Sequence, residues 1–170
     1  MFNISQKALK LIKNILLFTI FSSSFASALA QELISPDNQK IKLRLATTLA
    51  QQQSGLSGIK PKDFSKNEGM LFVYKSIGYR KFWMPDTYFN LDIIFLNSDL
   101  KIVAIEKDVP HHIGRKDDTK IYRTKAYIAH HVLEVRADSE FSKKLKVGDS
   151  LKWAGPISLE EIVSKTHQEQ

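Results

Sequence analysis

The stretch "LDIIFL", Leu91 to Leu96, decides the fold of this chain. Side chains at successive positions of a strand point to opposite faces, and five of these six residues are apolar. A strand with two apolar faces needs cover on both sides, which predicts a central strand of a sheet. Asp92 lies at its entrance and needs charged or hydrogen-bonding partners, because an unpartnered buried carboxylate is costly.

Further strands are expected on both sides of this stretch. Short segments with alternating or β-branched and aromatic residues recur along the chain, and turn residues separate them. The expected strands are 41–46, "MLFVYK" (70–75), "RKFWM" (80–84), "KIVAIE" (101–106), "YIAHHVLEVRA" (127–137) and a short one closing "VGDSLKW" (147–153). Short strands at this spacing predict a mainly β domain, a sandwich or a barrel.

One or two short helices complete the prediction. The first runs through "LAQQQSG" (49–55), and the residues that suit its start and end are Thr47 or Thr48 and Gly55 or Gly58. Ser158 and Glu161 have the spacing of a capping box, which predicts a second helix from Leu159 to about Lys165. A helical turn is expected at 141–146.

The first thirty residues predict a secretory signal peptide. A basic leader, an apolar segment and small residues follow one another: Lys7, Lys10 and Lys13, then "ILLFTIF" (15–21), then serines and alanines. Residues 26–28 and 28–30 both fit the A-x-A rule, and polar Gln31 favours cleavage after Ala30. The apolar run is far shorter than the ~20 residues that span a bilayer, so we expect no transmembrane span after cleavage and a periplasmic or extracellular location.

The amino-acid composition excludes several kinds of functional site. The chain has no cysteine, which excludes disulfides, thiolate catalysis and thiolate metal ligands. Three of its 25 basic residues and none of its 18 acidic ones lie in the leader, which leaves 22 against 18, a net charge of +4. The basic segment "GRKDDTKIYRTK" (114–125) also contains Asp117 and Asp118. Because a nucleic-acid face needs clustered basic residues, we expect no nucleic-acid partner and a solvated surface here, with contact to acidic lipid or polysaccharide as the alternative.

The chain resembles the domain-of-unknown-function family 192. The residues that carry the resemblance are "SGLSG" (54–58), "EGMLFVY" (68–74), "FWMPDTYFNLDIIFLNSDLKIVAI" (82–105), "VLEV" (132–135) and "VGDSL" (147–151). The resemblance implies a single compact, jelly-roll-like β-sandwich that is commonly exported, and it implies no activity. The expected layout is a signal peptide (1–30), an N-terminal lead (31–40), the β domain (41–155), and a C-terminal short helix and tail (156–170).

The family signature falls on Gly69, Met70, Phe82, Trp83, Met84, Thr87, Asp92, Gly148 and Asp149. Two residues depart from the family pattern. Leu100 stands where a glycine is usual, which suggests a different turn after Asn97. Asp86 replaces the more usual asparagine.

The candidate ligand-binding residues are Trp83, Asp86, Thr87 and Asp92. Trp83 alternates with two core residues and is expected to face a groove, where an aromatic beside these polar groups suits a small polar ligand. For Asp92 the favoured interpretation is a structural staple, bonded to the Thr87 hydroxyl, the Asn90 amide or the backbone N–H groups of "PDTYFN" (85–90), with a ligand-binding or catalytic role as the alternative. Asp86 is likewise typical of a turn.

Histidines suggest a metal site as an alternative. His111-His112 and His130-His131 invite a copper or zinc interpretation that uses His112 with His130 or His131, and Met70 and Met84 as soft ligands. Neighbours on a strand point to opposite faces, so each pair offers at most one imidazole to a given site. His131 shares a face with Leu133 and Val135, which suits a buried core histidine.

The sequence therefore favours an exported, non-enzymatic binding or accessory module without a cofactor. Its partner is expected to be a small polar ligand or a periplasmic protein. The alternatives are a periplasmic copper- or zinc-binding protein and a hydrolase centred on Asp92, for which no nucleophile elbow or phosphate-binding loop is present.

Overall fold

The computed structural model describes residues 30–166, apart from the side chain of Asp118. The chain divides into two compact units, Met1–Ala30 and Gln31–Gln170, and the expected signal peptide lies outside the described residues apart from Ala30. The elements of the second unit are β1 (Glu32–Ile34), β2 (Lys40–Ala46), α2 (Leu49–Ser54), η2 (Pro61–Asp63), β3 (Glu68–Phe72), β4 (Gly78–Arg80), β5 (Leu91–Leu96), β6 (Ile102–Val109), η3 (Asp118–Lys120), β7 (Tyr127–Ala129), β8 (His131–Arg136), α3 (Glu140–Lys143), β9 (Lys152–Ala154) and α4 (Leu159–Lys165).

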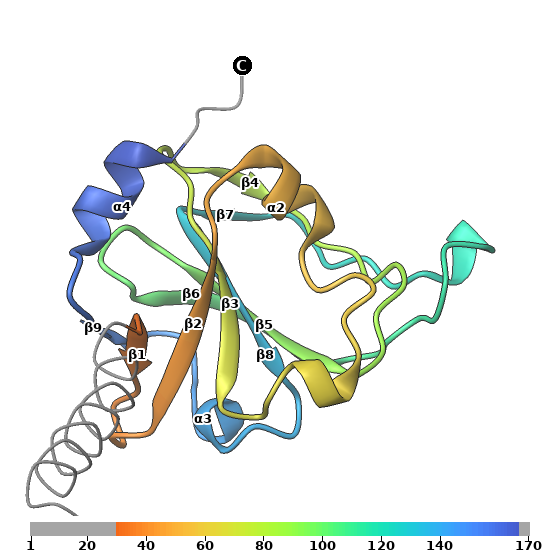
Figure 1. Cartoon of the computed structure of the whole chain (residues 1–170), viewed down its shortest axis with the longest axis horizontal. Helices are drawn as coiled ribbons and strands as arrows, with labels where there is room; N and C mark the ends of the chain where they lie inside the picture. Colours follow the sequence, from red (N-terminus) through yellow and green to blue (C-terminus); the bar gives the residue numbers. More distant parts are fainter. Residues whose placement is uncertain (1–29, 167–170) are drawn as a thin grey trace, which may run out of the picture. The chain divides into compact units, whose positions relative to one another are not determined.

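The second unit is a compact, mainly β domain, as expected. A curled seven-stranded sheet has the order β6-β5-β8-β3-β2-β1-β9, and β4 and β7 form a small second sheet (Figure 1). Only β2 and β3 pair in parallel; the other neighbours are antiparallel. β5 lies between β6 and β8 with all six residues buried, which confirms the central strand expected for "LDIIFL". The segment 31–40, expected as a lead, contributes β1 to this sheet.

Two apolar clusters cover the two faces of the large sheet. The first, which we call the helix-side core, includes residues of α3 and α4, for example Phe141 and Leu159. The second, the loop-side core, includes Leu56 and Phe64 from the connection between α2 and β3. Successive residues of β5 alternate between them, because Ile93 belongs to the loop-side core and Ile94 to the helix-side core.

The helices begin at residues that capping rules favour. Thr48 caps α2 in a capping box with Gln51, and Gly55 ends it with φ +48°. The Ser158 hydroxyl accepts from the Glu161 N–H at the start of α4, which confirms the predicted second helix. α3 is the third short helix of the described residues, at the expected helical turn.

Two of the expected strands were wrong in extent. In segment 80–84, Arg80 ends β4 and Trp83 forms only an isolated bridge with Arg123, because "PDT" turns the chain immediately afterwards. Segment 127–137 breaks at His130 into β7 and β8, which belong to different sheets. Apolar periodicity continues across this break and so does not reveal it.

Leu100 has φ +59°, the left-handed conformation that glycine favours. Leu100 is 4% exposed and belongs to the helix-side core. Burial of a leucine side chain is worth about 1.5–3 kcal/mol, which offsets the roughly 1–2 kcal/mol that left-handed backbone costs an L residue.

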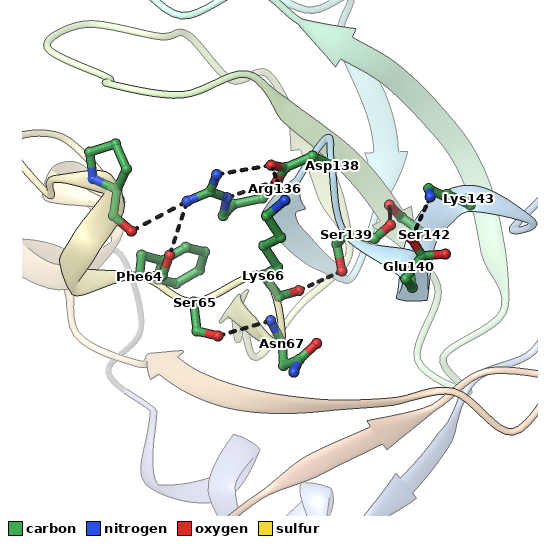
Figure 2. Close-up of polar contacts among 11 residues, drawn as sticks. Phe64, Ser65, Lys66, Asn67, Arg136, Asp138, Ser139, Glu140, Ser142 and Lys143 are labelled. Atoms are coloured by element: carbon green, nitrogen blue, oxygen red, sulfur yellow. Dashed lines mark hydrogen bonds and ion pairs between the residues drawn. The ribbon is translucent and has the colours of Figure 1, made fainter.

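A polar network ties the connection between α2 and β3 to the end of β8 (Figure 2). The Arg136 guanidinium donates to the carbonyls of Pro61 and Phe64 and pairs with both oxygens of Asp138. Lys66 Nζ lies 2.9 Å from the same carboxylate. The hydrogen bond from Arg136 holds the pKa of Asp138 well below its ordinary value. This network fixes the loop that covers one face of the sheet.

Candidate functional site

A pocket of about 330 Å³ opens on the loop-side face of the large sheet. Its wall comes from α2 and the loop after it, from the segment 81–87, from the large sheet and the residues next to its strands, and from the loop after β6 that bears Arg115. The polar and charged residues that line it are Gln52, Gln53, Ser54, Ser57, Tyr74, Lys81, Thr87, Arg115 and Glu134. Aromatic rings line it as well, namely Phe72, Phe82 and Trp83. Its volume lies at the low end of the range of small-molecule sites.

Glu134 is the chemically unusual residue of this pocket. It lies opposite Met70 and Ile93 in the sheet, and it is 4% exposed. Its Oε2 atom is buried without a hydrogen-bond partner among the described residues. Burial raises the pKa of Glu134 to about 8, so the group carries its proton near neutral pH. A Cβ atom at position 55 would stand 3.9 Å from Oε2, so Gly55 leaves space beside the carboxyl group.

Asp86 organises the edge of the pocket. Its backbone N–H donates to the Gly114 carbonyl at 2.7 Å, and Gly114 N–H donates to Asp86 Oδ1 at 3.2 Å. Its own carbonyl accepts from Gly58 N–H at 2.8 Å. Asp86 has φ +51°, which aspartate and asparagine tolerate better than other side chains do. This turn residue thereby joins the loop after α2 to the loop that bears Arg115.

Trp83 and Thr87 line the pocket, and Trp83 is 42% exposed. The Arg123 guanidinium lies 5.1 Å from the centroid of the Trp83 ring, and these two residues line an adjoining hollow with Lys81 and Phe82. Thr87 is buried, and its backbone N–H donates to the His112 carbonyl at 2.9 Å. These two sequence candidates therefore share one cavity.

Asp92 faces the opposite side of the sheet. It pairs with Val135 of the helix-side core, and it is 3% exposed. Lys107 Nζ donates to Oδ2 at 3.0 Å, and the Asp108 N–H donates to Oδ1 at 2.9 Å. These partners are in β6, so the nearby turn groups that we expected to bond Asp92 are not its partners. The arrangement is a staple between β5 and β6, and the four candidate residues do not form one cluster.

The described histidines contact different groups. His130 and His131 have ring centroids 5.5 Å apart, and His131 Nδ1 accepts from the Tyr74 N–H at 3.4 Å. Burial lowers the pKa of His131 to about 4, so the ring is neutral at pH 7. His112 Nε2 lies 3.1 Å from the Lys116 carbonyl oxygen. Between residues 30 and 166, no group of three or more His, Asp or Glu side chains is placed to hold a metal ion.

Sequence reasoning missed Glu134 as a site residue. The signal was present, because "VLEV" sets one carboxylate into an apolar strand just as "LDIIFL" does. Asp92 found two partners across the sheet, whereas Oε2 of Glu134 found none within the described part of the chain. The neighbouring strands determine whether a buried carboxylate has hydrogen-bond partners. The order of the strands in a sheet cannot be predicted from one sequence.

Comparison with known proteins places the chain in a family. The model of DUF192, described as "Uncharacterized ACR", matches residues 32–153, so the chain belongs to this family. No curated protein matched the chain. In the residues that the structure describes, no helix is long and apolar enough to cross a membrane.

Two solved structures share the fold. One is described as a "putative transcription regulator" from Sinorhizobium meliloti 1021; it is 25% identical, has a TM-score of 0.56, and the match covers 76% of this chain and 98% of that one. The other is a protein of unknown function from Novosphingobium aromaticivorans DSM 12444, 24% identical with a TM-score of 0.58, covering 73% of this chain and 84% of that one.

Proposed function

We propose that this chain is an exported, non-enzymatic binding protein whose pocket beside Glu134 takes a small polar ligand. One observation carries the proposal: the Glu134 carboxyl group lines the pocket while its buried Oε2 lacks a partner in the described structure. Buried polar groups in folded proteins are almost always hydrogen-bonded, so each exception asks for an explanation. A ligand with hydroxyl or other polar groups supplies the missing partner.

The surroundings of Glu134 suit binding. The pocket adds hydroxyl, amide and cationic side chains to aromatic walls, the combination of shape and a few polar groups that small-molecule sites use. A carboxyl group with a strongly raised pKa in a cleft is a recognised sign of a functional position. A buried carboxyl group without a hydrogen-bond partner lowers the stability of the fold. Such a destabilising residue is expected at a position that serves binding.

The test uses the unit Gln31–Gln170, since both core clusters lie within it. Thermal melting is followed with a panel of sugars, sugar acids and cell-wall fragments, for the wild type and for Glu134→Met. Methionine fills the same space without a polar group, so we expect the variant to melt at a higher temperature. We also expect a ligand that raises the wild-type melting temperature by several degrees to leave the variant unshifted.

Glu106→Gln is the matched control. Its carboxylate accepts from the hydroxyls of Tyr122 and Tyr127 and does not line the pocket. This change should lower the melting temperature and leave the ligand shift intact. A Glu134→Met protein that melts lower than the wild type and still responds to the ligand would make Glu134 a structural residue and overturn the proposal.

Export rests on the leader sequence. A basic start, an apolar segment and A-x-A sites precede Gln31. The chain is expressed at full length in a bacterium, and the protein from the periplasmic fraction is measured by intact mass. We expect a mature chain that begins at Gln31. Intact full-length chain confined to the cytoplasm would contradict export.

A further inference from the structure

The charged side chains of the pocket point to the class of ligand. Among the described lining residues the cations are Lys81 and Arg115, both exposed, and the one acidic residue is the buried Glu134. Neither cation forms an ion pair with another described residue. The adjoining hollow adds Arg123 beside Lys81. At the mouth of the pocket the two lining cations, Lys81 and Arg115, outnumber the one carboxylate at its edge, Asp86.

The carboxyl group of Glu134, in the deep part of the pocket, does not repel a negatively charged ligand near neutral pH. An ionised carboxylate would repel an anion, but burial raises the pKa of Glu134 to about 8. Below that pH the group is a neutral carboxylic acid, which both donates and accepts a hydrogen bond. It suits a hydroxyl group of a ligand whose charge lies at the mouth.

Size limits the ligand further. A volume of about 330 Å³ lies at the low end of the range of small-molecule sites. A single six-membered sugar ring with its hydroxyl groups fits such a space. The rings of Phe82 and Trp83 offer apolar faces to the C–H groups of such a ring.

We propose that the pocket takes a monoanionic ligand the size of one sugar ring, of the uronate class, with its carboxylate at Lys81 and Arg115 and its hydroxyl groups toward Glu134. This inference rests on the proposed function and names the ligand class for the same pocket. Asp86 serves it as a positioning residue, since its two hydrogen bonds to Gly114 hold the loop next to Arg115.

Three probes with the same ring test the charge directly. Glucuronate, glucose and glucosamine are titrated separately into Gln31–Gln170 at pH 6.5 and followed by calorimetry. Glucuronate should bind at least about tenfold more tightly than glucose, because hydrogen bonds to charged groups are worth about 1.5–3 kcal/mol. Glucosamine, a cation, should bind most weakly. Above pH 8 glucuronate should weaken as Glu134 ionises.

Variants locate the charge recognition. Lys81→Gln and Arg115→Gln should each weaken glucuronate roughly tenfold and leave glucose within about twofold. Lys116→Gln, next in the same loop but outside the pocket lining, is the control and should bind glucuronate as the wild type does. Equal losses in all three variants would indicate attraction by overall charge and overturn the assignment to Lys81 and Arg115.

Other outcomes separate this inference from the proposed function. Glucosamine as the tightest probe overturns the anionic class and makes Glu134 a carboxylate site for a cation. Glucose equal to glucuronate overturns the charge preference while the binding function stands. No heat with any of the three overturns the uronate class, and the melting panel with Glu134→Met then decides the binding function by itself.

Discussion

At the scale of single residues, Glu134 makes stability depend on pH. Its pKa is raised from 4.5 to about 8, so the folded state holds a proton that the unfolded state releases between these values. Its contribution is fully present below pH 4.5 and is lost as the pH rises through 8. His131 has the opposite sign: its pKa falls from 6.5 to about 4, so its contribution is present above 6.5 and lost toward 4.

The two residues nearly cancel between pH 4.5 and 6.5, and above 6.5 Glu134 acts alone. We therefore expect the free energy of unfolding to fall by about 1 kcal/mol between pH 6.5 and 8. Urea unfolding of Gln31–Gln170 at a series of pH values measures this. Glu134→Gln, which cannot ionise, should remove the decline. A decline of the same size in Glu134→Gln would show that another group causes it.

Asp92 gives a second prediction at this scale. Asp92→Asn removes the charge that faces Lys107 and leaves an amide oxygen to accept from only one of its two present donors. The expected loss of unfolding free energy is about 1–3 kcal/mol. Ligand binding should not change, because Asp92 lies on the other face of the sheet from Glu134. If Asp92→Asn lost ligand binding and kept the wild-type stability, Asp92 would be a binding residue, and this prediction would be wrong.

At the scale of elements, close packing of three strands depends on Gly69. A Cβ atom at this position of β3 would stand 2.9 Å from Leu133 Cδ1, 3.2 Å from Val135 Cγ1 and 3.3 Å from Ile41 Cδ1. These neighbours are fully buried, so they have little room to move. Gly69→Ala should therefore cost about 1–3 kcal/mol by overpacking.

Gly78→Ala is the matched control for this prediction. Gly78 also lies in a strand, and its added Cβ would meet only the side chain of Arg80, at 3.5 Å. Its expected effect on urea unfolding is within about 0.5 kcal/mol. Similar losses in both variants would contradict the steric explanation.

A helix or strand could be predicted from the sequence where the interactions that form it join residues close together in the chain. The caps of α2 and α4 involve residues three positions apart, so both helices were readable from the sequence. The two apolar faces of β5 were readable for the same reason. The break at His130 was not, because β7 pairs with β4 and β8 with β3 and β5, and these pairings join distant parts of the chain.

At the scale of the whole molecule, the sequence predicted only some of the residues that line the candidate site. Trp83 and Thr87 line the pocket, and both lie in the stretch whose alternation suggested a groove. Glu134 and Arg115 reach it from segments 30 to 50 positions away, through the order of strands and the loop held by Asp86. The tertiary contacts of the fold bring these residues together, so no local sequence pattern predicts that they lie close to one another.

The fold also places Asp92 and the pocket on opposite faces of the large sheet. The helix-side face holds Asp92 with Lys107 and the apolar residues of α3 and α4, whereas the loop-side face holds the pocket. The effects of variants on the two faces should therefore add when combined, because Asp92 and Glu134 point to opposite faces of the sheet and share no hydrogen-bond partner among the described residues. Asp92→Asn combined with Glu134→Met, followed by urea unfolding, checks this, and a coupling of more than about 0.5 kcal/mol would contradict it.

The most direct measurement is the titration of the Glu134 carboxyl group itself. Carbon-13 NMR of side-chain carboxyl groups in Gln31–Gln170 follows it with pH, and the resonance missing in Glu134→Gln assigns it. A desolvated, proton-bearing carboxyl in the pocket predicts a midpoint near pH 8. A midpoint near its ordinary value of 4.5 would show a solvated or well-partnered group and would contradict the binding site proposed around it.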